Sequence, residues 1–375
     1  MGKNSNLVAA KKAKQDEFYT RREDIEDELS HYVKHFEGKT VYCNCDDPVE
    51  SEFWKFFVRN FTAWKLKKLL ATHYEPNERN YAYKLELDGD VNGDGRVDWQ
   101  DEPTKTDLPC NGDFRSATCI ELLKEADIVV TNPPFSLFRE YVQQLVNYDK
   151  KFIIIGPRNA VTYKEVFPML KEGKMWIGYN SGDMSFKVPD YYEPRATRYW
   201  QDESGQKWRS MGNVCWFTNL DIPKRHEFLD LRGNYYDPAV NPKYDNYDAI
   251  EVGRIADIPC DWSGVMGVPI TFLDRYNAEQ FELLGMTDRN NEYGLTTKIY
   301  TTWVRRRLRQ CPADFPESTA PMEWRSRLCA RLSGRRPSDL PAQTGWRLRL
   351  GVRLRRRDSG FYRHALRTGA PAQHL

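Results

Sequence analysis

The segment Ala126-Asp127-Ile128-Val129-Val130-Thr131-Asn132-Pro133-Pro134-Phe135 decides the fold of this chain. Its first half is a short apolar run, which predicts a buried strand over residues 127–131. The tetrapeptide Asn132-Pro133-Pro134-Phe135 marks the point where that strand ends and a loop begins, because its two prolines stiffen the backbone and lack N–H donors. Ligands bind at the carboxyl ends of strands in open α/β sheets. We therefore expect a functional site at residues 132–135.

Each residue type in this tetrapeptide has a possible chemical use. Asn132 offers a side-chain carbonyl that can accept a hydrogen bond from an amino group, and the carbonyls of Pro133 and Pro134 remain acceptors. Phe135 offers a flat face for stacking. The combination suits an exocyclic amine on a flat heterocycle, such as N6 of adenine. The alternative is a rigid strand-to-helix turn in which Phe135 packs inward.

The surrounding chain alternates between strand-like and helix-like segments. Further strands are expected at 39–45, 67–72, 81–87, 152–155, 175–178 and 214–218, and helices at about 22–35, 49–61, 116–124, 137–146 and 161–170. Such alternation predicts an α/β fold with a Rossmann-like, doubly wound, mostly parallel sheet. Residues 180–212 are rich in Tyr, Trp, Arg and Pro and are interpreted as a loop insertion, and residues 221–303 as a small second module.

Composition excludes several classes of protein. No apolar run approaches the roughly 20 residues of a membrane span, and the polar, basic start of the chain is unlike a signal peptide. We therefore expect a cytoplasmic protein with no membrane partner. The eight cysteines are scattered, and Cys43 and Cys45 lack the spacing of a zinc or redox motif. Reduced thiols are expected.

The last 72 residues differ sharply in charge from the rest. Residues 304–375 hold 17 Arg, no Lys and 5 acidic residues, a net charge of +12, whereas residues 1–303 carry −10. An arm that binds phosphates, a disordered tail and an out-of-frame translation of a GC-rich gene end are all compatible with this composition. The last is favoured, because Ile and Asn are also absent.

A second motif fits the twelve-position calcium loop. It runs from Asp90 to Asp101, with Gly95 at the sixth position and a carboxylate at the twelfth. The candidate ligands are Asp90, Asn92, Asp94, Asp98 and Asp101. The twelfth residue is Asp rather than the usual Glu, which shortens its reach, and an Asp/Gly-rich surface turn would have the same composition. Any bound calcium ion would be structural.

With the strand before it and a helix after it, the tetrapeptide resembles the Asp/Asn-Pro-Pro-aromatic motif of N6-adenine DNA methyltransferases. The wider sequence resembles the EcoRI-type adenine-specific methyltransferase family over roughly residues 10–300. Three segments carry this resemblance, namely 16–20 (Asp-Glu-Phe-Tyr-Thr), 41–48 (Val-Tyr-Cys-Asn-Cys-Asp-Asp-Pro) and 127–138, which contains the tetrapeptide. The resemblance does not extend to the Arg-rich tail.

The resemblance implies a fold of the S-adenosylmethionine-dependent methyltransferase type and a donor site beside the early strands. Phe18, Tyr19 and Thr20 look like the upstream motif that closes over the donor, and Asp46 stands where a donor-site motif contacts the methionine moiety. The glycine-rich loop usual at that place is replaced by Asp46-Asp47-Pro48. Glu75, after the second strand, is placed to accept from ribose hydroxyls. Asp113 resembles the residue that accepts from the donor's adenine amine, with Phe114 flanking the ring.

The resemblance also divides the chain and implies its partners. We expect a flexible basic arm at 1–15, a catalytic domain at 16–220, a DNA-recognition module at 221–303 and the tail at 304–375. The expected substrate is double-stranded DNA, methylated by a monomer at a flipped-out adenine, in the setting of a restriction-modification system. The candidate phosphate-binding residues are Lys11, Lys12, Lys14, Arg195, Arg198 and Arg209.

Two other functions remain open at this point. Asn-Pro-Pro-aromatic motifs also serve amines of RNA and glutamine amides of proteins, so the substrate could differ. The second alternative is a decayed methyltransferase that binds DNA without catalysis. The unusual donor loop and the aberrant tail both favour this alternative.

Overall fold

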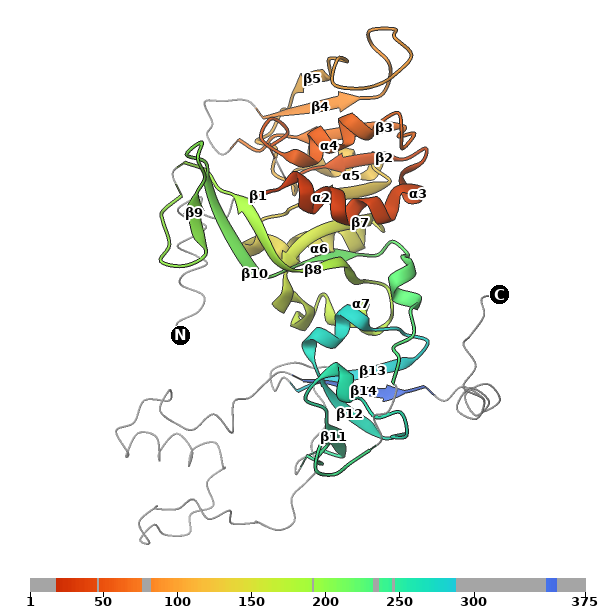
Figure 1. Cartoon of the computed structure of the whole chain (residues 1–375). Coiled ribbons are helices and arrows are strands. Elements are labelled where there is room, and N and C mark those ends of the chain that lie inside the picture. The colour runs from red at the N-terminus through yellow and green to blue at the C-terminus, as the bar shows by residue number, and fades with distance from the viewer. Residues whose placement is uncertain are drawn as a thin grey trace.

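A computed structural model describes residues 18–45, 47–75, 82–190, 192–231, 236–244, 247–287 and 349–355 of this chain, in two sheets (Figure 1). Asp46, most of the Arg-rich tail and the arm at 1–15, with the candidate residues Lys11, Lys12 and Lys14, lie outside the described residues. None of the described helices is both long and apolar enough to cross a membrane.

The larger sheet has the strand order β1-β8-β10-β7-β6-β2-β3-β4-β5, with β9 paired to β10. Its strands are β1 (Tyr19–Thr20), β2 (Thr40–Cys43), β3 (Lys68–Thr72), β4 (Tyr83–Leu87), β5 (Thr104–Asp107), β6 (Ile128–Thr131), β7 (Lys151–Pro157), β8 (Trp176–Lys187), β9 (Tyr199–Gln201) and β10 (Lys207–Thr218). The four strands β7, β6, β2 and β3 are parallel neighbours. The pairs β3–β4, β4–β5, β7–β10, β10–β8 and β8–β1 are antiparallel. The predicted α/β sheet with a parallel core is confirmed.

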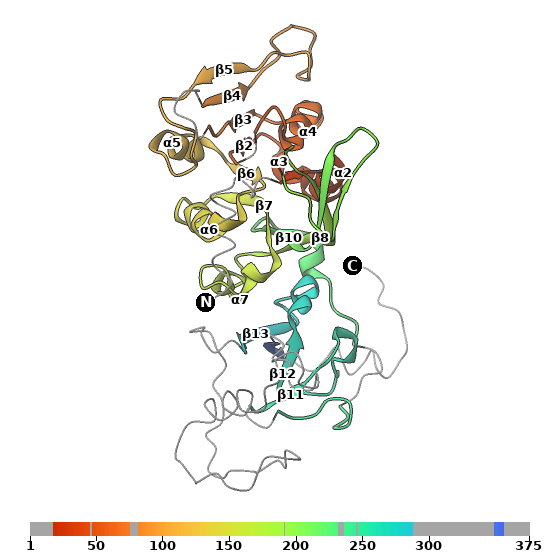
Figure 2. The ribbon, with the colours of Figure 1, turned by 90° about the vertical axis from the view of Figure 1, so that its left-hand side faces the viewer.

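Helices cover both faces of this sheet. Its α-helices are α2 (Arg22–Leu29), α3 (Val33–Phe36), α4 (Glu52–Asn60), α5 (Ala117–Glu125), α6 (Phe138–Asn147) and α7 (Phe167–Lys171). Viewed along the sheet, α2, α3 and α4 lie on one side and α5 and α6 on the other (Figure 2). In β6, Ile128 and Val130 pack into one core while Val129 packs into the other. Burial on both faces explains why the parallel strands are continuous apolar runs.

Two of the expected helices are interrupted. The 22–35 segment forms α2, a 3-10 turn at Ser30–Tyr32 and α3. The 161–170 segment forms a 3-10 helix, Arg158–Thr162, followed by α7, with Pro168 in the first turn of α7. A proline is tolerated there but not in a helix interior, so the helix cannot extend back to residue 161.

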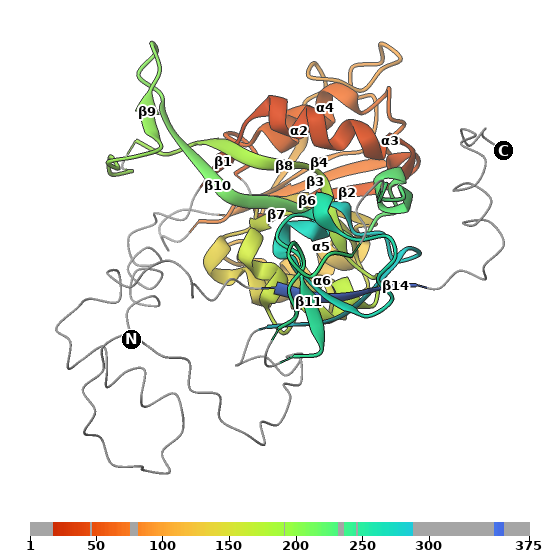
Figure 3. The ribbon, with the colours of Figure 1, turned by 60° about the horizontal axis from the view of Figure 1, so that its bottom comes forward.

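The interpretation of residues 180–212 as a loop is wrong. This segment contains the second part of β8, all of β9 and the first part of β10, which pair as an antiparallel ribbon. We call these strands, from 180 to 212, the ribbon. It stands away from the body of the molecule on the side of β1 (Figure 3). Aromatic residues such as Trp200 and Trp208 lie opposite each other in it, and side-chain pairing of this kind stabilises strands.

The smaller sheet has the order β11-β12-β14-β13 and contains part of the tail. Its strands are β11 (Ala249–Glu251), β12 (Val265–Pro269), β13 (Phe281–Met286) and β14 (Arg349–Leu354). β14 pairs antiparallel with both β12 and β13, and Leu350 and Val352 are buried. The expectation of a disordered tail is therefore wrong for residues 349–354, because their apolar side chains fill the centre of this sheet.

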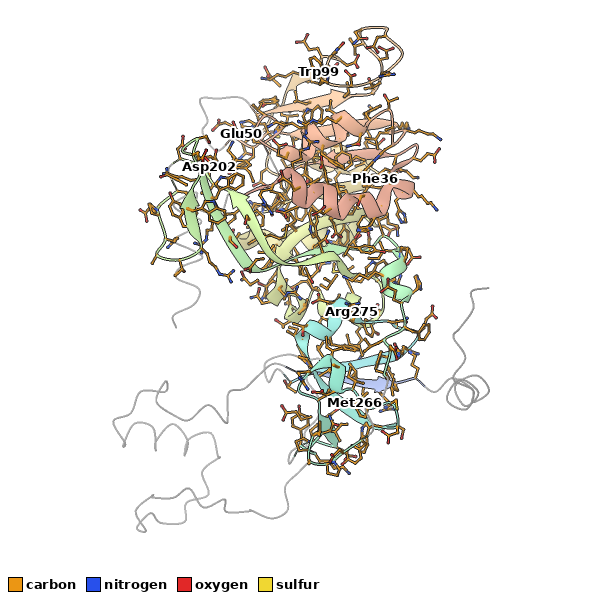
Figure 4. The ribbon with its side chains drawn as sticks, viewed as in Figure 1. Phe36, Glu50, Trp99, Asp202, Met266 and Arg275 are labelled. Atoms are coloured by element: carbon orange, nitrogen blue, oxygen red, sulfur yellow. The ribbon has the colours of Figure 1, made fainter. Side chains whose placement is uncertain are left out.

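The smaller sheet packs below the larger one (Figure 1). Arg158, after β7, forms an ion pair of 2.9 Å with Asp274, and both side chains are largely buried. Lys171 of α7 donates to the carbonyl of Leu284 in β13. In the side-chain view, Arg275 marks the junction and Met266 the smaller sheet (Figure 4). Buried apolar side chains of both sheets also belong to one hydrophobic core, so apolar and polar contacts together join the two sheets.

Candidate active site

The tetrapeptide 132–135 lies at a topological switch point of the larger sheet. β2 has β3 on one side and β6 on the other, so the chain progresses in opposite directions from β2. Open α/β sheets bind ligands in the crevice outside the strand ends at such a point. The backbone N–H of Cys45, after β2, donates to Oγ1 of Thr131, the last residue of β6, at 3.2 Å. This bond brings the two strand ends together at the predicted site.

A buried hydrogen-bond network supports this edge. The hydroxyl of Tyr141 in α6 donates to Oδ1 of Asn44 at 2.5 Å, and the hydroxyls of Tyr42 and Thr72 lie 3.1 Å apart. Asn44 is 4 % exposed. Polar groups buried so deeply are stable only when they are hydrogen-bonded. Sequence analysis did not select Asn44, Thr131 and Tyr141. The signal for Asn44 and Thr131 was a polar residue at the end of an apolar strand, whereas Tyr141 in α6 gave no such signal.

Asn132 is held by the upstream segment that the resemblance singled out. Its side-chain Nδ2 donates to the backbone carbonyl of Phe18 at 2.6 Å, and the residue is 7 % exposed. Tyr19 and Thr20 follow as β1, which pairs with the end of β8. The structure therefore places residues 18–20 beside the tetrapeptide.

Aromatic rings surround this contact. The ring centroid of Phe18 lies 5.9 Å from that of Phe135, 5.9 Å from Phe186 and 6.1 Å from Tyr192. We call these four residues the aromatic cluster. Phe135 is partly exposed, whereas Phe186 and Tyr192 are buried. The exposed part of Phe135 is available to a flat ligand.

Two acidic residues proposed for the donor come from neighbouring loops. The backbone N–H of Glu75, after β3, donates to the carbonyl of Asn111 at 2.9 Å. Gly112 has a φ of +77°, and a Cβ there would lie 2.1 Å from the carbonyl oxygen of His73. Only glycine fits this close approach. The structure thus brings the loop of Glu75 against the loop of Asp113.

The side chains of Asp113 and Phe114 have partners within the protein. Arg115 donates through Nε and Nη2 to the two oxygens of Asp113, at 2.9 and 2.7 Å. Its Nη1 donates to Glu140. Hydrogen bonding to Asp113 raises the pKa of Arg115, so this guanidinium stays charged. Phe114 is 5 % exposed and its ring packs edge-on against Tyr141. Their roles toward a donor stay predictions.

Asp47 and His73, which sequence analysis did not select, form an ion pair at the same edge. Nδ1 of His73 lies 2.9 Å from Oδ2 of Asp47, and Nε2 lies 3.9 Å from Glu75. The hydrogen bond with Asp47 raises the pKa of His73 despite partial burial. Burial opposes ionisation of Asp47, but hydrogen bonds from His73 and from the backbone of Val49 outweigh it and lower the pKa.

The side chains at this edge of the sheet suit the chemical groups of the donor, S-adenosylmethionine. An acidic side chain after the second parallel strand suits ribose hydroxyls, and the side chain of Glu75 is 13 % exposed. Carboxylates at 47, 75 and 113 come from three different loops of the same edge. Asp46, the predicted contact of the methionine moiety, lies outside the described residues.

The predicted calcium loop joins β4 to β5 at the far end of the sheet, where Trp99 is exposed (Figure 4). Its side chains accept hydrogen bonds from backbone N–H groups of the loop itself. Asp101 accepts from Val91, Asn92 and Asp98, and Asp90 accepts from Gly93 and Gly95. Within the described residues, no group of three or more His, Cys, Asp or Glu side chains is arranged to hold a metal ion. Calcium binding by this loop stays a prediction.

An α/β sheet with Asn-Pro-Pro-Phe at its switch point is the arrangement of an α/β methyltransferase. The profile of the family described as adenine-specific methyltransferase EcoRI matches residues 6–315. The chain belongs to this family and is an S-adenosylmethionine-dependent DNA adenine methyltransferase. The match ends before β14, so the last strand of the smaller sheet comes from outside the family profile.

Three curated relatives are similar over most of their length. The Type II methyltransferase M.EcoRI of Escherichia coli is 48% identical over 292 residues, which are 75% of this chain and 89% of that protein. M.MgeORF184P of Mycoplasma genitalium is 43% identical over 73% of this chain and 84% of its own length. M.MpnI of Mycoplasma pneumoniae is 41% identical, with coverages of 73% and 83%. No solved structure shows a significant match.

Proposed function

We propose that this chain methylates N6 of a flipped-out adenine at a specific sequence in double-stranded DNA, with Asn132, Pro133, Pro134 and Phe135 as the acceptor site. The observation that carries this proposal is the position of Asn132. Its nearly buried side chain stands at the carboxyl end of β6, at the switch point, and is oriented by a hydrogen bond to Phe18.

Asn132 and Pro133 activate the acceptor. The lone pair of the adenine amine is delocalised into the ring, so the amine is a poor nucleophile. Side-chain Oδ1 of Asn132 and the carbonyl of Pro133 accept its two N–H groups and localise the lone pair on nitrogen. Fixed dipoles that face the developing positive charge also stabilise the transition state.

An adenine inside a duplex cannot reach this edge, so the base has to leave the stack. Phe135 stacks on the flipped base, a contact of about 1–3 kcal/mol. Pro134 keeps the turn rigid, because its φ is fixed. Holding acceptor and donor in line contributes roughly 7–11 kcal/mol at most to lowering the barrier.

The donor lies at the ends of β2 and β3. S-adenosylmethionine supplies a sulfonium-bound methyl group, and its transfer requires no metal. Glu75 accepts from the ribose hydroxyls, Asp113 from the adenine amine of the donor, and Asp46 holds the methionine moiety. Phe114, Tyr19 and Thr20 complete the enclosure. The placement of the Glu75 and Asp113 loops against each other supports this assignment.

The ribbon and the smaller sheet contact the DNA. The major groove admits a pair of β-strands such as β8 and β10, and the ribbon carries Arg195, Arg198 and Arg209 beside an exposed tryptophan, Trp200. Lys187 of the ribbon is paired to Glu50, which holds its base near α4 (Figure 4). The smaller sheet contributes to sequence reading as the module at 221–303, completed by β14.

We further propose that the protein acts as a monomer, in the cytoplasm, as the modification partner of a restriction system. The role in a restriction system is supported by the relatives, which are Type II methyltransferases of bacteria. Size-exclusion chromatography with light scattering tests the monomer, and a dimer would overturn it.

Transfer of labelled methyl groups to plasmid DNA, total RNA and a protein mixture tests the proposed substrate. We expect label in DNA only, and its loss in Asn132→Ala with the fold intact. Label in RNA or protein would instead favour those substrates. A protein that binds no S-adenosylmethionine in calorimetric titration would be a non-catalytic DNA-binding module.

Calcium binding by residues 90–101 is a proposal that rests on spacing alone. Thermal unfolding with calcium and with a chelator tests it. A higher unfolding midpoint in calcium, lost in Asp90→Ala, would support binding, and an unchanged midpoint would end the proposal.

A further inference from the structure

Phe18 connects two parts of the molecule that are far apart in sequence. Its backbone carbonyl accepts from Nδ2 of Asn132, 114 positions later. Its ring contacts Phe135 of the acceptor site on one side and Phe186 and Tyr192 of the ribbon segment on the other. One residue therefore contacts Asn132 and Phe135 of the proposed acceptor site and the base of the ribbon.

The strand pairing extends this connection into the ribbon. Tyr19 and Thr20 of β1 lie opposite Lys187 and Phe186 of β8. Phe186 in turn lies opposite Arg209 of β10. Thr20, Phe186 and Arg209 thus share one face of the antiparallel strands, because residues directly opposite each other project to the same side. Paired strands therefore link the ribbon to Tyr19 and Thr20, which directly follow Phe18.

We propose that Phe18 is a positioning residue for methyl transfer, which aligns Asn132 through its carbonyl and Phe135 through its ring and couples both to the ribbon. This inference rests on the proposed acceptor site. It assigns to Phe18 a role toward the acceptor adenine, in place of the donor contact that the sequence resemblance implies.

The carbonyl contact explains why position 132 requires an amide in this chain. An amide has two ends, a donor NH2 and an acceptor oxygen. Because the NH2 end is directed at the carbonyl of Phe18, Oδ1 is turned toward the other side, where the adenine amine has to be accepted. A carboxylate would instead place a charged oxygen 2.6 Å from a carbonyl oxygen, with no proton between them. The family motif admits Asp or Asn, but this contact selects Asn.

The first experiment removes the ring and keeps the carbonyl. Phe18→Leu is compared with Phe56→Leu, a matched change at a buried phenylalanine of α4 that packs against Phe57 and Trp64. Four quantities are measured for each: kcat with plasmid DNA, Kd for DNA by filter binding, Kd for S-adenosylmethionine by calorimetry, and the unfolding midpoint. Phe56→Leu reports the effect of losing a buried ring on stability alone.

Phe18→Leu is expected to lower kcat about tenfold or more, a barrier increase of about 1.4 kcal/mol. Both dissociation constants should stay within about threefold of the parent. A tenfold weaker binding of S-adenosylmethionine would show that Phe18 contacts the donor and would overturn the proposal. A lower unfolding midpoint with unchanged kcat, as expected for Phe56→Leu, would show a merely structural role and would overturn it as well.

The second experiment tests the carbonyl contact through pH. Asn132→Asp should lose transfer at pH about 8, and its activity relative to the parent should rise as pH falls. The reason is that a neutral carboxyl group can donate to the Phe18 carbonyl, and the facing oxygen raises the pKa of the carboxyl group. Asn132→Ala should show no such recovery. A ratio of Asn132→Asp to parent activity that does not change with pH would contradict the positioning role.

The two proposals fail in different ways. Full activity of Asn132→Ala would show that the acceptor site is elsewhere, and the proposed function would fall together with this inference. Loss of activity in Asn132→Ala with no effect of Phe18→Leu and no pH dependence in Asn132→Asp would leave the acceptor site standing and remove only the role of Phe18.

Discussion

Nδ1 of His73 lies 2.9 Å from Oδ2 of Asp47, so an ion pair joins the loop after β3 to the loop after β2. The carboxylate of Asp47 also accepts from the backbone N–H of Val49 at 2.8 Å. The imidazole stacks on Tyr83 of β4, with centroids 4.9 Å apart. Asp47, in the segment that replaces the usual glycine-rich loop, is therefore fixed by side-chain and backbone contacts.

This pair predicts a pH dependence of stability. The pKa of His73 is raised above its ordinary value of 6.5 by the bond to Asp47, so its stabilising contribution is complete below pH 6.5 and disappears as pH rises through the folded-state pKa. The pKa of Asp47 is lowered from 3.8, so its contribution is present above that pH and disappears in stronger acid. The unfolding midpoint should fall as pH rises above about 6.5, and His73→Gln should flatten this slope. An identical slope in His73→Gln would show that the pair does not govern it.

The position of β14 predicts that the tail strand stabilises the smaller sheet. Leu350 is 1 % exposed between β12 and β13, so Leu350→Ala should cost about 2–5 kcal/mol of unfolding free energy. Hydrogen exchange of β12 and β13 should accelerate in that variant and in a chain that ends at residue 348. Leu354→Ala, at a less buried position, should cost less. Unchanged exchange after truncation would show that β14 does not complete the sheet.

The ribbon predicts a salt-dependent contribution to DNA binding. Arg195→Ala and Arg209→Ala should each weaken binding to plasmid DNA and reduce the slope of log Kd against log salt by about 0.9, the value for one lost phosphate contact. The matched control is Lys124→Ala, at the end of α5 and at the amino-terminal edge of the sheet. It should leave the slope unchanged. If Arg195→Ala and Arg209→Ala kept the same slope as Lys124→Ala, the ribbon would not contact the DNA.

Removal of metal ions should leave methyl transfer intact. The reason is that a sulfonium methyl group is already activated and its transfer needs no Lewis acid. Activity in excess EDTA should stay within about twofold of the untreated enzyme. A loss of activity that added calcium restores would show that the 90–101 loop binds an ion the enzyme needs.

The parallel half of the fold could be predicted because its signals are local. Apolar runs bounded by Gly, Pro or Asp identified β2, β3, β6 and β7, and Asn132 follows one of them directly. The ribbon could not be predicted, because its Tyr, Trp and Arg residues obscure the alternation expected of a strand. Leu350, Val352 and Leu354 do alternate with Arg and Gly. That period of two was the signal that a strand exists in the tail.

The contacts that organise the site could not be predicted from the sequence. Asp47 and His73 lie on separate loops, and Phe18 meets Asn132 only because β1 pairs with β8 at the far end of the sheet order. Nothing in the local sequence indicates which backbone carbonyl a side-chain amide will contact. Such pairings depend on strand order, which alternation alone does not determine.

Base-resolution mapping of methylated plasmid DNA tests the central claim most directly. Plasmid treated with the parent protein and S-adenosylmethionine should carry N6-methyladenine at one short sequence, and plasmid treated with Asn132→Ala should carry none. Methylation at cytosine, or undiminished adenine methylation by Asn132→Ala, would contradict the account.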